Sequence, residues 1–132
     1  MNKESTNKKG SIKPNGVVLK DHKNATIVYL TEQGYDIELI PKSNVEGVHT
    51  ADIRIGDFEW EIKAPKGQGK WVLKNTVKKA LRQSENIIID LRRIKLPQSK
   101  CLPELENHFK LSKRAKRMIV ITKSRKMLEF SK

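Results

Sequence analysis

An aspartate, a glutamate and a lysine lie close together in the middle of the sequence, between Asp52 and Lys63. Two short runs of alternating apolar and polar residues flank Gly56-Asp57, a typical two-residue turn, and this pattern predicts a β-hairpin. With that turn Asp52 lies opposite Glu61, and the Cβ atoms of such partners are about 4.5–5.5 Å apart. Two carboxylates at this distance repel each other, so the pair requires a positive charge between them.

Lys63, on the same face of the hairpin, supplies one such charge, and a divalent cation would supply two. Paired carboxylates hold Mg²⁺ or Mn²⁺ through a few oxygens and leave positions for water and phosphate oxygens. Lys63 would then orient or deprotonate the attacking water, or stabilise the charge that develops on phosphorus. The same pattern is also typical of an ordinary solvated strand face, with Arg54 and Glu59 as a cross-strand pair. The pattern alone leaves both interpretations open.

An aspartate, eight further residues and then Glu-x-Lys form a spacing that resembles the PD-(D/E)xK nuclease superfamily. Within it, Trp-Glu-Ile-Lys-Ala-Pro-Lys-Gly (60–67), a basic helix and Asn-Ile-Ile-Ile-Asp-Leu-Arg (86–92) resemble the tRNA-cleaving C-terminal domains of contact-dependent growth inhibition toxins. The resemblance covers roughly residues 21–123. It implies an α/β fold of helix, three strands, helix and strand with a mixed central sheet. It also implies a metal-dependent endonuclease for RNA, with tRNA favoured over DNA.

The resemblance assigns roles to individual residues. Asp52 and Glu61 would bind Mg²⁺ or Mn²⁺, and Lys63 would complete the catalytic site. In those toxins the first helix opens with a His-Glu pair whose acid joins the active site, but this sequence has His22-Lys23. The third carboxylate is therefore missing, while His22 remains a candidate phosphate contact. The resemblance also implies a small acidic immunity protein, delivery from another cell within a larger toxin, and action in the cytoplasm.

The composition agrees with a polyanionic partner. The 132 residues carry a net charge of +13 and a sequence pI of about 10.0. Such a balance most often indicates nucleic acid and less often an anionic membrane surface. The single cysteine, Cys101, excludes an internal disulfide framework and suits a reducing cytosol. No apolar run approaches the length of a membrane span, so we expect a soluble chain with no membrane segment.

Basic residues gather after the hairpin. The loop at 65–70 contains two glycines and two lysines and would admit phosphate closely. A helix is predicted from about residue 70 to 86, with four cations at i, i+4 spacing on one face. Like charges at that spacing are unfavourable, and a nucleic-acid backbone would reverse the cost. The candidate nucleic-acid-binding residues are Lys66, Lys70, Lys74, Lys78, Arg82 and Gln83.

The remaining elements are predicted from periodicity and turn residues. Residues 1–15 read as a mobile basic arm, and residues 16–132 as a single nuclease-like domain. We expect a helix at 21–34, strands at 35–41 and 49–55, and a fully covered central strand at 86–91 followed by Arg92-Arg93. A loop at 97–103, a helix at 104–117, a strand at 118–122 and a basic tail with one helical turn at 127–128 complete the chain.

Other classes of function stay open at this point. One is a metal-independent RNase of the barnase and colicin type, in which Lys63, His22 and Thr76 act on the ribose 2′-OH. Another is a DNA-cleaving enzyme of the same superfamily, because the spacing of the acidic residues is shared with such enzymes. A third is a non-catalytic nucleic-acid-binding module, which the replacement of a family carboxylate by Lys23 would permit.

Overall fold

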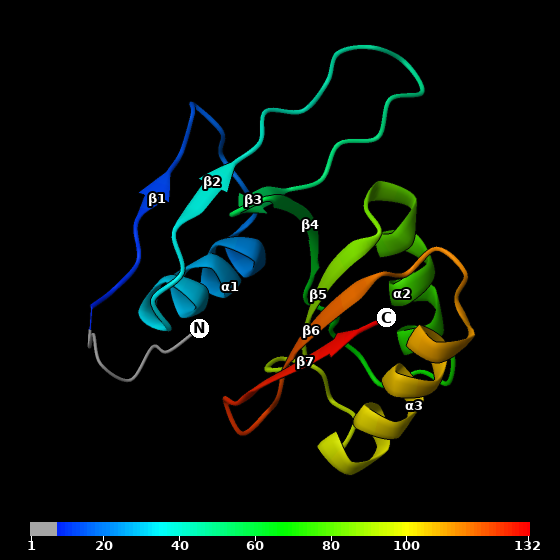
Figure 1. Ribbon diagram of the computed structural model, residues 1–132. Coiled ribbons are helices and arrows are strands. Elements are labelled where there is room, and N and C mark those ends of the chain that lie inside the picture. Colours follow the sequence, from blue (N-terminus) through cyan, green and yellow to red (C-terminus); the bar gives the residue numbers. More distant parts are fainter. Residues whose placement is uncertain (1–7) are drawn as a thin grey trace.

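A seven-stranded mixed sheet with three helices makes up the computed structural model, which describes residues 8–132 (Figure 1). The elements in chain order are β1 (Ile12–Lys13), α1 (Asp21–Glu32), β2 (Ile37–Leu39), β3 (Ile53–Ile55), β4 (Phe58–Lys63), α2 (Val72–Gln83), β5 (Asn86–Asp90), α3 (Gln98–Leu111), β6 (Arg117–Ile121) and β7 (Met127–Ser131). The strands lie side by side in the order of the chain. The expected succession of helix, three strands, helix and strand is present from α1 to β5.

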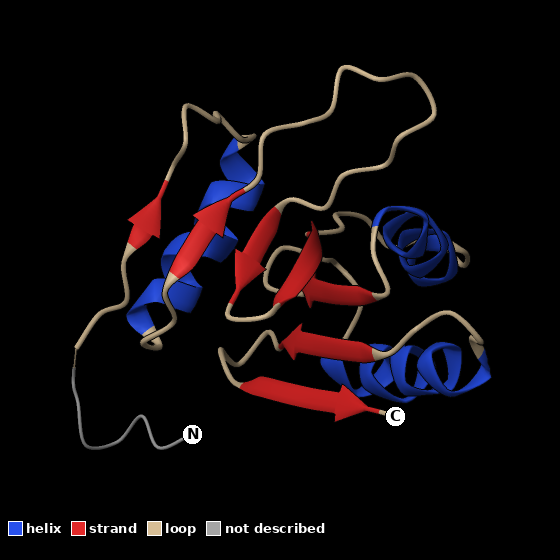
Figure 2. Ribbon diagram, turned by 45° about the horizontal axis from the view of Figure 1, so that its top comes forward, coloured by secondary structure: helices blue, strands red, loops and turns tan. Residues whose placement is uncertain are grey.

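The sheet combines parallel and antiparallel pairs, as expected for a mixed sheet. β2, β3 and β4 are antiparallel neighbours, β4, β5 and β6 are parallel, and β7 returns antiparallel to β6. α1 lies apart from α2 and α3 (Figure 2), and α2 packs beside α3, β4 and β5. The loop between β2 and β3 projects away from the sheet (Figure 2).

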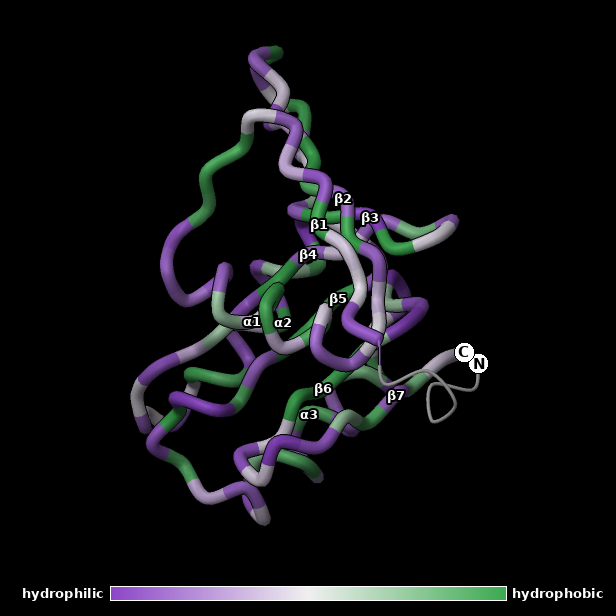
Figure 3. The backbone as a smooth tube through the Cα atoms, turned by 90° about the vertical axis from the view of Figure 1, so that its left-hand side faces the viewer, coloured by the Kyte–Doolittle hydropathy of each residue, from purple (hydrophilic) through white to green (hydrophobic). Residues whose placement is uncertain are grey.

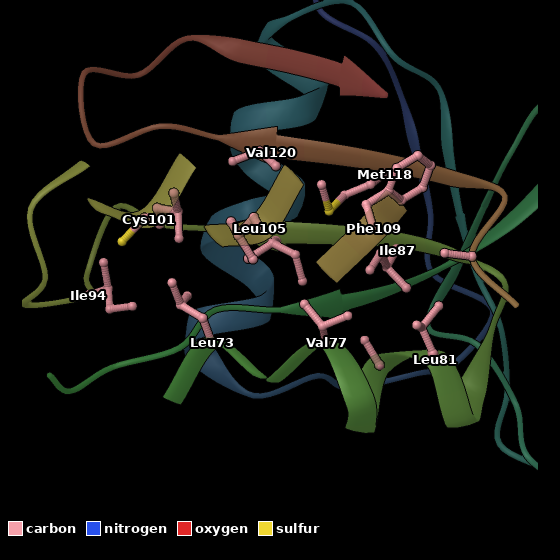
Figure 4. Packing of buried hydrophobic residues seen from close by; sticks show 14 of the residues in the cluster. Leu73, Val77, Leu81, Ile87, Ile94, Cys101, Leu105, Phe109, Met118 and Val120 are labelled. Atoms are coloured by element: carbon pink, nitrogen blue, oxygen red, sulfur yellow. The ribbon is translucent and has the colours of Figure 1, made fainter. Parts of the chain in front are cut away.

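Two hydrophobic clusters pack against the sheet. Leu73, Val77 and Leu81 of α2 face α3 and β5 in one of them (Figure 4). The other cluster joins α1 to the sheet through Ile27 and Leu30. Alternate residues of β5 enter the two clusters, and all five of its residues are buried. The prediction of a central strand covered on both faces is therefore confirmed. Figure 3, which colours the backbone by hydropathy, shows hydrophobic residues along β5 and the neighbouring strands.

The hairpin has the register predicted from the sequence. Ile53 pairs with Trp60, Arg54 with Glu59, and Ile55 with Phe58. The turn between them uses Gly56 at φ 60°, a left-handed conformation that glycine adopts without strain. Arg54 and Glu59 form the expected exposed cross-strand ion pair, 2.7 Å between Nη2 and Oε2. This register brings Asp52 beside Glu61.

Residues 10–15 belong to the folded domain, although we expected them in a mobile arm. The Gly10 N–H donates to the Thr31 carbonyl at 2.7 Å, and β1 pairs in parallel with β2. A Cβ at Gly10 would lie 1.7 Å from the Tyr35 carbonyl oxygen, so only glycine fits there. The Ser11 hydroxyl and backbone N–H both donate to Asp36. The rest of the predicted arm, residues 1–7, lies outside the described residues.

Two predictions for the C-terminal part are wrong. α3 begins at Gln98 and ends at Leu111, so residues 98–103 are helical and 112–116 are not. The buried side chains of Cys101 and Leu105 lie one turn apart on the inner face, and their packing outweighs the cost of Pro103 inside the helix. Residues 127–131 form β7 and not a helical turn, because β6 offers this segment an edge for backbone hydrogen bonds.

Candidate functional site

Lys23 lies between the two paired carboxylates. It belongs to the first turn of α1, and its Nζ is 2.8 Å from Asp52 Oδ2 and 3.5 Å from Glu61 Oε2. The helix brings it there because Ile27 and Leu30, one and two turns further on, anchor α1 in the core. The Lys23 side chain is 16% exposed, so the ammonium sits at the boundary between the buried pair and solvent. A positive charge between the carboxylates was required, and Lys23 supplies it.

Asp52 is fully buried, in contrast to a solvated strand face. Its Oδ2 accepts the Ile62 N–H at 2.9 Å, and its Oδ1 lies 3.1 Å from the Lys42 Nζ. Burial by itself raises the pKa of Asp52. Hydrogen bonds from Lys23 and from the Ile62 N–H, together with the charges of Lys23 and Lys42, outweigh that effect and hold the pKa below its ordinary value. Asp52 is thus an ionised anchor for two ammonium groups.

Glu61 is also buried but is less well partnered. Its Oε2 lies 3.5 Å from both the Lys23 and the Lys63 Nζ, and within residues 8–132 its Oε1 accepts no hydrogen bond. Burial and the negative charge of Asp52 raise the pKa of Glu61, although three lysines oppose them. The two carboxylates therefore have opposite tendencies: Asp52 stays ionised, and Glu61 is the one that binds a proton more readily.

The donor set does not fit a divalent cation in this arrangement. The position shared by both carboxylates is taken by the Lys23 ammonium, and both Asp52 oxygens already accept protein hydrogen bonds. Across residues 8–132 no group of three or more histidine, cysteine, aspartate or glutamate side chains is placed to hold a metal ion. Within residues 8–132 the buried acceptor without a hydrogen-bond partner, Glu61 Oε1, is a single oxygen, and Mg²⁺ needs several.

His22 and Lys63 lie at the edge of this cluster. Burial and the nearby charges of Arg93, Lys23, Lys20 and Lys63 lower the pKa of His22, so the imidazole sits in a positive field. Lys63, at the end of β4, is 28% exposed and is the member of the cluster most open to solvent after Lys42. His22 therefore lies beside the carboxylate cluster, and its contact with a phosphate stays a prediction. The Thr76 hydroxyl instead donates to the Val72 carbonyl within α2.

The predicted basic stripe is exposed on α2 and on the loop before it. Lys70 precedes the helix, which begins at Val72, while Lys74, Lys78 and Arg82 lie on its solvent face. Among residues 8–132 no hydrogen bond or ion pair joins these cations, Lys66 or Gln83 to the paired carboxylates. The Nζ atoms of Lys70 and Lys74 lie 5.0 and 5.3 Å from the centre of the exposed Trp71 ring. The stripe is thus separate from the carboxylate cluster.

Several residues of the site were not identified from the sequence. Lys23 was interpreted only as a lost carboxylate, and Lys42 only as part of a loop. A buried network at the end of β5 was also missed: Asp90 accepts the Thr26 hydroxyl at 2.6 Å and pairs with Arg92 at 2.8 Å. The available signal was the requirement for a cation between Asp52 and Glu61, but residues 29 and 38 positions apart cannot be paired by spacing alone.

The fold and the site together define a class: a small basic α/β domain with a buried carboxylate pair neutralised by lysines. The family model of the contact-dependent growth inhibition CdiA C-terminal domain matches residues 49–127, which include β3, β4, α2, β5, α3 and β6. The chain belongs to this family. No curated protein matches the chain.

A solved structure supports the same fold. The chain superimposes with a TM-score of 0.66 on a CdiA-CT/CdiI toxin and immunity complex from Burkholderia pseudomallei. The match covers 93% of this chain and 100% of the other, at 21% sequence identity. Similarity at this level of identity establishes the arrangement of helices and strands. Across residues 8–132, none of the helices has the length and apolar character needed to cross a membrane.

Proposed function

We propose that this domain is a toxin nuclease of the PD-(D/E)xK superfamily that cleaves phosphodiester bonds in RNA, with tRNA as the favoured substrate. The observation that carries the proposal is the buried pair of Asp52 and Glu61, surrounded by lysines at the end of a hairpin. A buried carboxylate with a raised pKa suits a general base, and cations beside it can stabilise the charge that develops on a phosphoryl group. Membership of the growth-inhibition family and the net charge of +13 support a nucleic-acid substrate.

In this proposal Glu61 is the general base. Its Oε1 is the acceptor without a protein partner, and its raised pKa suits a group that takes a proton from water or a ribose hydroxyl. Lys63 stabilises the negative charge that develops on the phosphoryl oxygens, because its ammonium is the more exposed of the two near Glu61. Asp52 positions Lys23 and Lys42 and keeps the hairpin aligned through the Ile62 N–H.

The need for Mg²⁺ or Mn²⁺ stays a prediction of the superfamily resemblance. A divalent ion at Asp52 and Glu61 would have to displace the Lys23 ammonium, which lies 2.8 Å from Asp52. The position of Lys23 favours a second candidate, a metal-independent RNase that acts on the ribose 2′-OH. Chelation distinguishes the two, because only the metal enzyme stops when divalent ions are removed.

The direct test is incubation of the purified chain with total tRNA and with duplex DNA, in Mg²⁺, in Mn²⁺ and in chelator. We expect discrete tRNA fragments and intact DNA. Glu61→Gln preserves the shape of the side chain and should abolish the fragments, whereas Lys79→Gln, on the exposed face of α2, should not. Cleavage of DNA but not of tRNA would show that the substrate is DNA and not RNA. Salt-dependent binding of tRNA without any cleavage would identify a non-catalytic module.

The proposed biological setting is growth inhibition in the cytoplasm of a target cell, after delivery within a larger toxin. The similar structure is a toxin and immunity complex, and this supports an immunity protein as partner. A small acidic protein would be steered to a chain with charge +13. Expression of the intact domain alone should stop growth, and the Glu61→Gln chain should be tolerated at the same level. Equal growth with both chains would contradict the toxin role.

A further inference from the structure

A basic pocket opens directly beside the proposed nuclease site. It has a volume of about 160 Å³ and is lined by side chains from α1, from the ends of β4 and β5, and from the β6–β7 turn. Ala64 in its wall follows Lys63, and His22 in its wall precedes Lys23, so the pocket adjoins the carboxylate cluster on two sides. The volume is below the roughly 300–1,000 Å³ of pockets for drug-sized ligands, and it suits a phosphate group with part of a sugar.

The pocket has an excess of positive charge. Its lining contains three arginines and one acid, Asp90. Arg92 already neutralises Asp90, with Nε 3.0 Å from Oδ1 and Nη2 2.8 Å from Oδ2. In the described part of the chain, neither Arg93 nor Arg125 forms an ion pair with an acid. The Arg93 Nε donates to the Ala64 carbonyl at 2.7 Å, so the Nη atoms of Arg93 and the guanidinium of Arg125 remain available to an anion. Arginine is the side chain best shaped to bind phosphate oxygens.

The walls of the pocket are held rigidly. Asp90 is buried and accepts the Thr26 hydroxyl at 2.6 Å, and the Arg92 guanidinium lies 4.9 Å from the centre of the Tyr29 ring. The Tyr29 hydroxyl donates to the Arg125 carbonyl at 2.9 Å. Arg125, in the turn between β6 and β7, has φ 66°, a left-handed conformation that costs a non-glycine residue energy. The network therefore fixes the turn that carries the Arg125 side chain.

We propose that this pocket binds a phosphate group of the substrate, next to the phosphodiester that is cleaved. The inference rests on the proposed nuclease function for the identity of the substrate. The phosphate is either a neighbouring diester of the same chain or a terminal monoester. Arg93 and Arg125 contact its oxygens, while Arg92 acts through Asp90 and positions the wall.

The test measures phosphate binding directly and does not depend on cleavage. Inorganic phosphate, a nucleoside 5′-monophosphate and a dinucleoside monophosphate without terminal phosphate are titrated while the His22 ring signals are followed by NMR. The variants are Arg93→Gln with Arg125→Gln, against a control of equal charge change, Lys79→Gln with Lys113→Gln, two exposed lysines outside the proposed binding sites. We expect the pocket variant to lose binding at least about tenfold, and the control less than about twofold, because a phosphate contact is worth at least 1.4 kcal/mol.

The outcomes separate the two proposals. Preferential binding of the monophosphate assigns the pocket to a chain terminus, and binding of the dinucleotide assigns it to a neighbouring diester. Equal losses in the pocket variant and in the lysine control would mean that only the net charge matters, and would overturn the pocket. Cleavage of tRNA by a chain that fails this test leaves the nuclease function intact. Pocket-specific phosphate binding by a chain that cleaves nothing refutes the nuclease function alone.

Discussion

Replacing Lys23 with methionine should destabilise the protein strongly at neutral pH. The substitution keeps most of the side-chain volume but removes the ammonium 2.8 Å from Asp52 and 3.5 Å from Glu61. Removing one partner of a buried ion pair costs about 3–5 kcal/mol, because the remaining charge is left without compensation. Lys42 and Lys63 stay near the pair, so we expect the lower end, about 3 kcal/mol. The expected loss of stability is large for a single lysine near the surface, because both carboxylates that it neutralises are buried.

The loss should depend on pH with a definite sign. Without Lys23 both carboxylates lose a nearby cation, so the pKa of each rises in the folded state above its present value. The unfolded chains have the same carboxyl pKa values, so the pH dependence of the stability difference between Lys23→Met and the parent comes from the two folded states. The difference is fully present above the raised folded pKa values of the variant and is lost as the pH falls through the lower folded pKa values of the parent. In the parent the folded pKa of Asp52 lies below 3.8, so the difference should shrink progressively as the solution is acidified to that pH and beyond.

Urea unfolding followed by far-UV circular dichroism measures both parts. At about 2 kcal/mol/M, a loss of 3 kcal/mol moves the midpoint by about 1.5 M at pH 7. The matched control is Lys79→Met, which removes an exposed lysine from α2 and should change stability by less than about 0.5 kcal/mol. A Lys23→Met chain as stable as the control at pH 7 would refute the stabilising role of Lys23 between Asp52 and Glu61. A loss of unchanged size at acid pH would refute its electrostatic origin.

Three further predictions concern the site and the basic stripe. Lys63→Met should lower cleavage by about 10²–10³-fold with little change in substrate affinity, since the ammonium acts on developing charge; an equal rise in KM alone would contradict this. Lys42→Gln should move the acid limb of the pH–rate profile to higher pH, because removing a cation raises the pKa of Glu61 further; an unmoved limb would exclude Glu61 as the base. Lys74→Gln with Lys78→Gln should lower the slope of log K against log salt by about 2 for duplex substrates, and an unchanged slope would mean that this face contacts no phosphate.

Local signals were sufficient for the centre of the fold. The Gly56-Asp57 turn and the alternation on either side determine the hairpin register, because each pairing lies within a few residues of the turn. The apolar run at 87–89 likewise predicts a strand covered on both faces. Both predictions needed only nearby residues, and both are confirmed.

Signals that depend on distant contacts were not visible in the sequence. Residues 97–103 were interpreted as a loop because of Pro103. The cost of a proline inside a helix is visible from the local sequence, whereas the packing of Leu105 against α2 depends on distant residues. The segment that forms β7 was interpreted as a basic tail, because only its pairing with the edge of β6 makes it a strand. Lys23 read as the loss of a catalytic acid, because the sequence does not show that its ammonium reaches both carboxylates. The sequence predicted that Asp52 and Glu61 lie together, but not that Lys23 is their counter-ion.

The residue at position 23 determines the charge balance of the site. Asp52 and Glu61 contribute two negative charges, and Lys23, Lys42 and Lys63 contribute three positive ones within 3.5 Å of them. The site is thus already neutralised by the chain itself. A glutamate at position 23 would give three carboxylates and two lysines, and a buried excess of negative charge is costly unless a cation binds.

Lys23→Glu should therefore make the stability of the folded domain depend on a divalent ion. We expect the variant to be less stable than the parent in chelator and to gain thermal stability on addition of Mn²⁺, because an ion that binds only the folded state stabilises it. The parent and an exposed control, Lys79→Glu, should show no such gain. The readout is the unfolding temperature, so it holds whether or not the variant cleaves RNA. A comparable Mn²⁺ gain in the parent would show that the ion displaces the Lys23 ammonium, and that the carboxylate pair binds metal as the superfamily resemblance implies.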